Sequence, residues 1–207
     1  SVTVCTGCEN NGDGTVSCLE WDKDPSSSDL FMDADVLSTS DGGVLFVGYG
    51  YIASAGYGNA LFVQKFDKVG APVNSFGTAG IAIYGPSYSG HSVTSVIYSS
   101  VVETDDGYAM LARVLFNDNN DSTERRALWL NRIDDLGNSL DDNYYFYNTD
   151  LSGNLTDAVD LVYANSGFLI VGSHSNGTHS DIWVVKTDSD GDTCPIVNGE
   201  CNEGSKW

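Results

Sequence analysis

Residues 37–49 read "LSTSDGGVLFVGY", and this stretch decides the fold because it recurs twice along the chain. Residues 101–113 read "VVETDDGYAMLAR", and residues 161–173 read "LVYANSGFLIVGS". In each copy a turn ends in glycine and a short apolar run follows, which is typical of a buried β-strand. The glycines are Gly43, Gly107 and Gly167, and they lie 64 and 60 residues apart. The chain is therefore predicted to contain three repeats of about 60 residues.

A second apolar run follows each of these glycine turns. Residues 59–70 read "NALFVQKFDKVG", residues 126–137 read "RALWLNRIDDLG" and residues 180–191 read "SDIWVVKTDSDG". They share an aromatic residue (Phe62, Trp129, Trp183), then a base (Lys65, Arg132, Lys186), an aspartate (Asp67, Asp134, Asp188) and a glycine (Gly70, Gly137, Gly191). Aspartate first and glycine last is the preference of a type I turn. Because side chains alternate along a strand, the base is expected on the face opposite the aromatic residue.

One segment also fits a helix. Residues 122–137, "STERRALWLNRIDDLG", have Thr123 as a candidate cap and Gly137 as a candidate stop. The match of this segment to the other two repeats favours a strand.

These repeats resemble the delta-60-type and related β-propeller repeats of secreted bacterial proteins, over residues 30–192. In that family each unit is a four-stranded blade, so the resemblance implies an all-β fold. Three blades are too few to close a propeller, which typically has about four to eight. We therefore expect an incomplete or compacted propeller-like structure or a β-sandwich, with open edges that recruit further strands.

The repeats divide the chain into three parts. Residues 1–29 form a cysteine-bearing N-terminal segment, and residues 193–207 form a cysteine-closed C-terminal tail. Between them, the three blade-like repeats are expected at residues 30–92, 93–153 and 154–192.

The charge balance excludes two classes of partner. The 207 residues include 9 Lys and Arg against 29 Asp and Glu, for a net charge of −20. Such a surface repels nucleic acid and anionic membranes, and it favours divalent cations and basic partners. No apolar run approaches the roughly 20 residues of a membrane-spanning helix.

The five cysteines lie only at the two ends of the chain. Their pattern lacks the paired CxxC or histidine partners of a zinc site, so disulfides formed in an oxidising compartment are the better interpretation. We expect Cys194 to pair with Cys201, and two of Cys5, Cys8 and Cys18 to pair with each other. The first residue is Ser1, as a cleaved export signal or a trimmed chain would give. Sequons at Asn120, Asn154 and Asn176 are compatible with a secreted or cell-surface glycoprotein.

Residues 9–20, "ENNGDGTVSCLE", resemble a dockerin-type or EF-hand-type calcium loop. The candidate ligands in order are Glu9, Asn11, Asp13, Thr15 through its carbonyl, Ser17 and Glu20. Calcium takes six to eight hard oxygen ligands, and Gly14 occupies the sharp-turn position of such a loop. Glu9 stands where Asp is usual and flanking helices are not evident. The competing interpretation is a disulfide-closed turn rich in Asn and Gly.

Two further acidic stretches are weaker calcium candidates. The first is Asp188, Asp190 and Asp192 in "DSDGD", although the matching turns "DKVG" and "DDLG" lack the extra acids. The Asp-to-Gly turn is therefore structural in the first place. The second, residues 116–122, is expected to be a solvated hairpin tip.

No catalytic residue is predicted. His174 and His179 lie in a loop with Asp181 as the nearest carboxylate, and His91 has no GxSxG nucleophile elbow to serve. The repeated aromatic residues are expected in the core rather than on a sugar-stacking surface. Residues 143–148, "NYYFYN", fit either an exposed aromatic patch or a strand buried on both faces.

These features predict a non-enzymatic extracellular structural or interaction module. It would contact copies of itself, other surface proteins or glycans, for example as a subunit of a filament or adhesive appendage. Residues 1–4, "SVTV", alternate between apolar and polar residues and are expected to add as a strand to an open sheet edge, either of a neighbouring subunit or of the last blade of the same chain. The alternative is a calcium-dependent carbohydrate- or protein-binding module of a larger secreted protein. A hydrolase with unrecognised residues is a third class.

Overall fold

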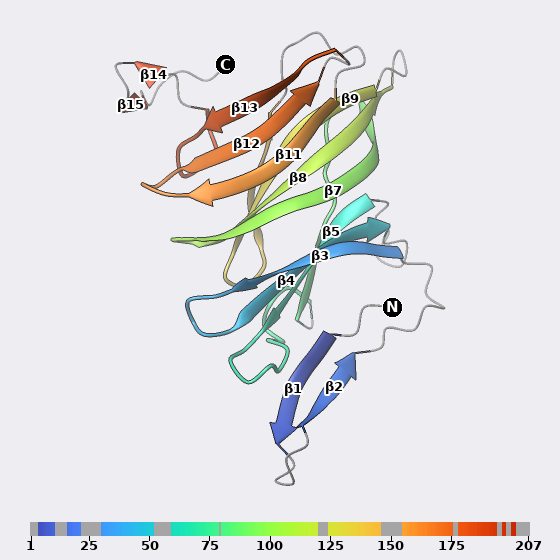
Figure 1. Ribbon diagram of the computed structural model, residues 1–207, viewed down its shortest axis with the longest axis vertical. Coiled ribbons are helices and arrows are strands. Elements are labelled where there is room, and N and C mark those ends of the chain that lie inside the picture. Colours follow the sequence, from blue (N-terminus) through green and yellow to red (C-terminus); the bar gives the residue numbers. More distant parts are fainter. Residues whose placement is uncertain are drawn as a thin grey trace.

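The computed structural model describes residues 4–10, 16–21, 30–51, 59–78, 80–119, 124–145, 155–175, 178–193, 196–197 and 200–201. Over these ranges every regular element is a β-strand, so the all-β prediction is confirmed (Figure 1). The described residues contain no helix long and apolar enough to cross a membrane.

Three open antiparallel sheets are each built from strands that follow one another in the chain. The first contains β3 (Leu30–Ser38), β4 (Val44–Tyr51), β5 (Asn59–Phe66) and β6 (Ile81–Tyr84). The second contains β7 (His91–Thr104), β8 (Gly107–Asp118), β9 (Glu124–Asp134) and β10 (Ser139–Tyr145). The third contains β11 (Leu155–Tyr163), β12 (Phe168–Ser175) and β13 (Ser180–Lys186). The segment that also fitted a helix is therefore a strand, β9.

Two hairpins lie outside these sheets. The first pairs β1 (Val4–Asn10) with β2 (Val16–Trp21), and the second pairs β14 (Ile196–Val197) with β15 (Glu200–Cys201). Val4 is opposite Trp21 in the first hairpin, which lies at the other end of the molecule from β13 (Figure 1). Val4 is thus part of this hairpin, whereas residues 1–3 lie outside the described residues, so addition of residues 1–4 to an open sheet edge stays a prediction.

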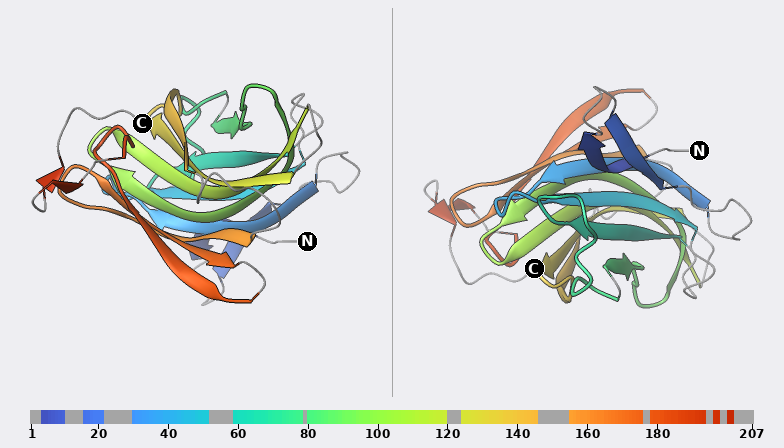
Figure 2. Two further views of the ribbon diagram at one scale, coloured as in Figure 1. Left: turned by 90° about the horizontal axis from the view of Figure 1, so that it is seen from above. Right: turned by 90° about the horizontal axis from the view of Figure 1, so that it is seen from below.

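The second sheet lies between the other two (Figures 1 and 2). Side chains alternate along β8, so that Met110 and Phe116 pack toward the first sheet whereas Ala109 and Leu111 pack toward the third. The second sheet is therefore buried on both faces. Full burial of each aliphatic or aromatic side chain contributes about 1.5–3 kcal/mol, which makes these two contacts the main source of stability.

The repeated Asp-to-Gly turns have the same geometry in all three sheets. Each aspartate accepts hydrogen bonds at Oδ1 from the backbone N–H groups two and four residues later, at 2.8–3.0 Å. The glycine three residues on has a φ of 83°, 78° or 81°, a left-handed conformation that glycine adopts readily. The aspartates are Asp67, Asp134 and Asp188, and the glycines are Gly70, Gly137 and Gly191. The structural role expected for these turns is confirmed.

Candidate functional site

The repeated basic residue marks each contact between sheets. Lys65 is 7% exposed and pairs with Asp41 of its own sheet at 2.9 Å. Its Nζ also lies 5.3 Å from the ring centre of Tyr108, which belongs to the second sheet. Burial is the largest influence on the pKa of Lys65 and acts to lower it, but the hydrogen bonds with Tyr108 and Asp41 raise the pKa overall. The charged amine thus joins the two sheets.

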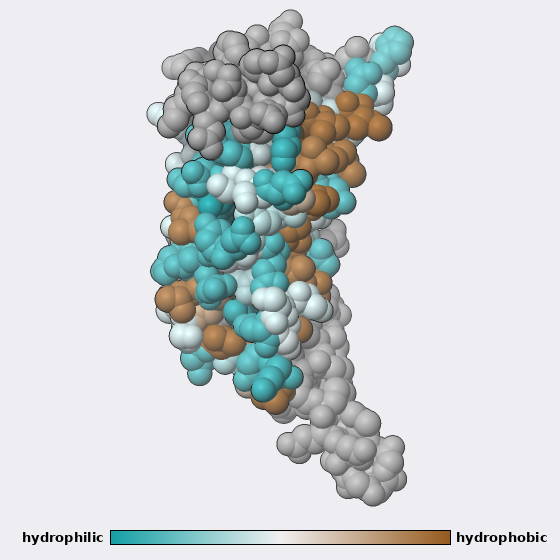
Figure 3. All heavy atoms as spheres, turned by 90° about the vertical axis from the view of Figure 1, so that its left-hand side faces the viewer, coloured by the Kyte–Doolittle hydropathy of each residue, from teal (hydrophilic) through white to brown (hydrophobic). Residues whose placement is uncertain are grey.

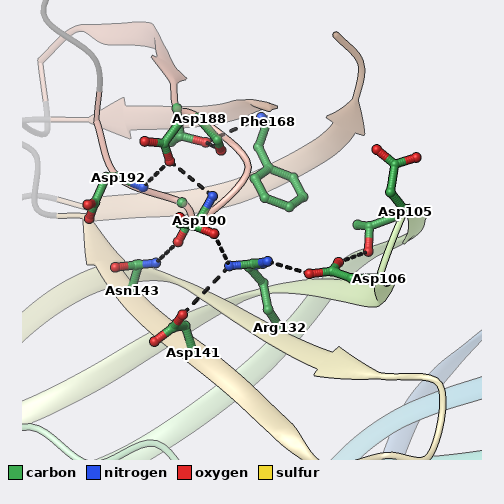
Figure 4. A network of polar contacts seen from close by, with 12 residues as sticks. Asp105, Asp106, Arg132, Asp141, Asn143, Phe168, Asp188, Asp190 and Asp192 are labelled. Carbon is green, nitrogen blue, oxygen red and sulfur yellow. Dashed lines mark hydrogen bonds and ion pairs between the residues drawn. The ribbon is translucent and has the colours of Figure 1, made fainter. Parts of the chain in front are cut away.

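Arg132 has the position of Lys65 in the second sheet, and it likewise contacts the neighbouring sheet (Figure 4). Its guanidinium lies 2.8 Å from Asp106 and 3.7 Å from Asp141, both of the second sheet, and 3.2 Å from Asp190 in the turn of the third. The Arg132 side chain is 5% exposed, whereas the three carboxylates are 51–72% exposed. The base is therefore held inside the contact while its acidic partners remain in water.

Lys186 is the third member of this series, and no sheet in the described part of the chain lies next to it. It is half-buried at the end of β13, opposite Leu169. No carboxylate among the described residues lies within ion-pair distance of it. The outer face of the third sheet, to which Lys186 belongs, is thus uncovered where the corresponding faces of the other sheets are covered.

We call this surface the outer face. By strand register it contains Val162, Leu169, Val171, Ile182, Val184 and Lys186, together with the polar residues Asp160 and Ser173. Ile182 is 80% exposed, Val184 53%, Val162 47% and Leu169 41%. Exposed hydrophobic residues gather toward the upper right of the view in Figure 3. A contiguous apolar patch of a few hundred Å² on a soluble protein commonly marks an interaction site.

The repeats show how unusual this exposure is. Leu61 in β5 and Leu128 in β9 occupy the position of Ile182, and both are 0% exposed. Val63 and Leu130 occupy the position of Val184, and they too are 0% exposed. Side chains of the next sheet cover these residues, whereas no sheet formed by the described residues covers the outer face of β13.

In each of the first two sheets, a tyrosine on the fourth strand forms a hydrogen bond to the backbone of the next sheet. Tyr84 in β6 donates its hydroxyl hydrogen to the carbonyl of Gly137 at 2.7 Å. Tyr145 in β10 donates in the same way to the carbonyl of Gly191. Burial raises the pKa of both hydroxyls well above the ordinary value of tyrosine. Sequence reasoning missed this pair because Tyr84 follows Gly70 by 14 residues and Tyr145 follows Gly137 by only 8.

The aromatic residues pack in the interior over the described part of the chain. Trp129 is 1% and Phe62 5% exposed, as expected of core residues, and Trp183 is half-buried against the core between the second and third sheets. In "NYYFYN", Tyr144 packs on one side of the second sheet and Tyr145 on the other. This part of the segment is thus a strand with aromatic packing on both faces, while residues 146–148 lie outside the described ranges.

The predicted calcium loop is only partly described. Asn11, Asp13, Gly14 and Thr15 lie outside the described residues, whereas Glu9 is in β1 and Ser17 and Glu20 are in β2. The register places Glu9 opposite Ser17 and Glu20 opposite Cys5. No group of three or more His, Cys, Asp or Glu side chains in the described ranges is arranged to hold a metal ion. Calcium binding here stays a prediction.

The three aspartates of the weaker calcium candidate already have partners. Asp188 accepts the N–H groups of Asp190 and Asp192, and the carboxylate of Asp190 contacts Arg132. This arrangement fits the structural role of the turn. His91 packs in an aromatic cluster with Tyr88 and Phe116, and its Nδ1 lies 2.8 Å from the carbonyl oxygen of Ser89.

The remaining predicted sites stay largely untested. The register of the first hairpin places Cys8 directly opposite Cys18 and Cys5 opposite Glu20. Cys201 lies in β15, whereas Cys194 and the sequon residues Asn120, Asn154 and Asn176 lie outside the described residues.

Comparison with known proteins identifies no relative. No protein-family model matches the chain, and no curated protein or solved structure matches it significantly.

Proposed function

We propose that this protein is a non-enzymatic structural or interaction module of the extracellular space or cell surface, which associates with copies of itself. In this proposal its three sheets are blade-like repeats of an incomplete propeller-like array. The observation that supports it most is the outer face, because its counterparts on the other two sheets are each covered by a neighbouring sheet.

The energetics favour a weak and salt-dependent association. Burial of Ile182 and Val184 is favourable at about 25 cal/mol per Å² of apolar surface. A stable interface usually buries about 800 Å² on each partner, more than these few side chains supply alone. The net charge of −20 opposes self-association. Salt screens this repulsion and leaves the apolar contact intact, so association should strengthen as ionic strength rises.

Sedimentation velocity over a concentration series tests the proposal, at ionic strengths of about 0.01 M and about 0.15 M. We expect a concentration-dependent increase in mass that is larger at the higher ionic strength. Ile182→Asp should abolish it, because the variant places a charge in the centre of the contact. Val36→Asp is the matched control, since Val36 is 57% exposed on β3, an edge strand of the first sheet.

A wild-type protein that stays monomeric under all these conditions would contradict self-association. Loss of association in both variants alike would show that added charge, and not the outer face, is responsible.

A further inference from the structure

The third sheet differs from the other two at its edge as well as on its face. In the first sheet the third strand, β5, pairs with β4 on one side and β6 on the other. In the second sheet β9 pairs in the same way with β8 and β10. Within the described residues β13 pairs with β12 alone. Its other edge carries backbone donors and acceptors of the kind that pair with an added strand.

Comparison of β13 with β5 and β9 shows which residue of a fourth strand would lie beside it. Leu61 in β5 is opposite Tyr84, and Leu128 in β9 is opposite Tyr145. The two tyrosines therefore hold the same place in their sheets, although sequence spacing does not reveal it. The corresponding residue of β13 is Ile182, which is 80% exposed where its two counterparts are 0% exposed.

We propose that β13 accepts an extended segment of another polypeptide chain as the fourth strand of the third sheet, with an aromatic ring opposite Ile182. β6 and β10 show the pattern that such a segment should follow. Main-chain hydrogen bonds would supply affinity and the ring would fix the register, as in other cases of strand addition. This inference rests on the proposed role as an interaction module but not on self-association.

Charge selects among the segments that fit this pattern. Asp181 is exposed at the start of β13, and the whole chain has a net charge of −20. An uncharged or basic segment is therefore favoured over an acidic one. Of the two internal examples, β6 reads "IAIY" and has no charge, whereas β10 reads "SLDDNYY" and has two aspartates. β6 is accordingly the better template for a probe.

The probe is an end-capped synthetic peptide with the sequence of residues 80–86, "GIAIYGP". It is titrated into the ¹⁵N-labelled protein, and amide shifts are followed by NMR at a protein concentration at which sedimentation velocity shows a monomer. We expect saturable shifts of the amides of residues 181–186. Ile182→Asp should weaken binding at least about tenfold through loss of the contact with the ring, whereas Val36→Asp should leave it unchanged.

Two N-methylated peptides test whether the contact is a β-ladder. One is methylated at the amides of Ile81 and Ile83, and the other at those of Ala82 and Tyr84. Alternate amides of a strand point to opposite edges, so one peptide should lose binding while the other retains it. Equal behaviour of the two peptides would overturn the proposal.

Changes at Tyr84 of the peptide test the register. Tyr84→Ala should weaken binding because the ring opposite Ile182 is lost. Tyr84→Phe should bind as well as the parent peptide, because the acceptor of the hydroxyl lies in a following sheet that this complex lacks. The absence of saturable shifts, or shifts centred away from β13, would refute the inference. Because the titration uses monomer, failure of self-association would leave a positive peptide result intact.

Discussion

Gly43→Ala tests whether the repeated glycine is required by close packing of two strands. Gly43 lies directly before β4 and does not have a left-handed φ, so its backbone conformation is open to alanine. A Cβ atom at this position would lie 2.4 Å from the carbonyl oxygen of Phe66, and 3.1 Å and 3.2 Å from polar atoms of Asp41 and Thr39. The cost of the substitution is therefore steric.

The size of this effect follows from the contact. An ordinary contact of this kind begins at 3.4 Å, so the Phe66 carbonyl must retreat by about 1 Å from its present 2.4 Å. Overpacking of this order costs about 1–3 kcal/mol, and a weakened ladder hydrogen bond between β4 and β5 adds about 1 kcal/mol. We expect a total loss of about 3 kcal/mol in the free energy of unfolding. For a chain of this length this corresponds to a fall of about 6–12 °C in Tm.

Thermal and urea unfolding, followed by circular dichroism, measure this loss. Gly167→Ala should behave like Gly43→Ala, because its Cβ would lie 2.4 Å from the carbonyl of Thr187. Gly90→Ala is the control, since Gly90 has a φ of 76° and nothing within 4 Å of the added atom. It should cost only about 1 kcal/mol, from the left-handed conformation. If Gly43→Ala and Gly167→Ala destabilise no more than Gly90→Ala, the steric argument fails.

Two further predictions concern the contacts between sheets and the turn beside Lys65. Tyr84→Phe and Tyr145→Phe should each lower the free energy of unfolding by about 1 kcal/mol, because each leaves a glycine carbonyl without its donor; urea unfolding measures the loss, and no change in either variant would contradict the role of the hydroxyl. Hydrogen bonds from the Thr39 hydroxyl, from Lys65 and from the Gly43 N–H hold the pKa of Asp41 well below its ordinary value of 3.8. The ionised form of Asp41 therefore stabilises the fold at pH values above this ordinary pKa. The stabilisation is lost as the pH falls from there toward the lower pKa of the folded state. Asp41→Asn should lower Tm near neutral pH, and the difference from wild type should shrink progressively below about pH 4; a difference that does not change with pH would exclude this carboxylate as the cause.

Much of the local structure was predictable from the sequence. The turns of Asp67, Asp134 and Asp188 depend on an aspartate and a glycine at fixed spacing, which makes them visible in the chain itself. The strands that flank the turns follow from alternation, which also placed Lys65 and Arg132 on the face opposite Phe62 and Trp129. These features arise from backbone geometry and from side chains a few residues apart, so a short stretch of sequence contains all the information they need.

The order and coverage of the sheets were decided only by the tertiary structure. Leu61, Leu128 and Ile182 occupy equivalent places and look alike in sequence, yet the first two are 0% exposed and the third is 80% exposed. Whether such a residue is buried depends on a neighbouring sheet about 60 residues away in the chain, and a local pattern does not contain that contact. The tyrosine contacts to Gly137 and Gly191 are hidden for the same reason, since connections of different length bring Tyr84 and Tyr145 to one place. The sequence by itself thus determined the three sheets and their turns, whereas stacking in space determined that the last sheet, within the ranges the structure describes, has an open face and an open edge.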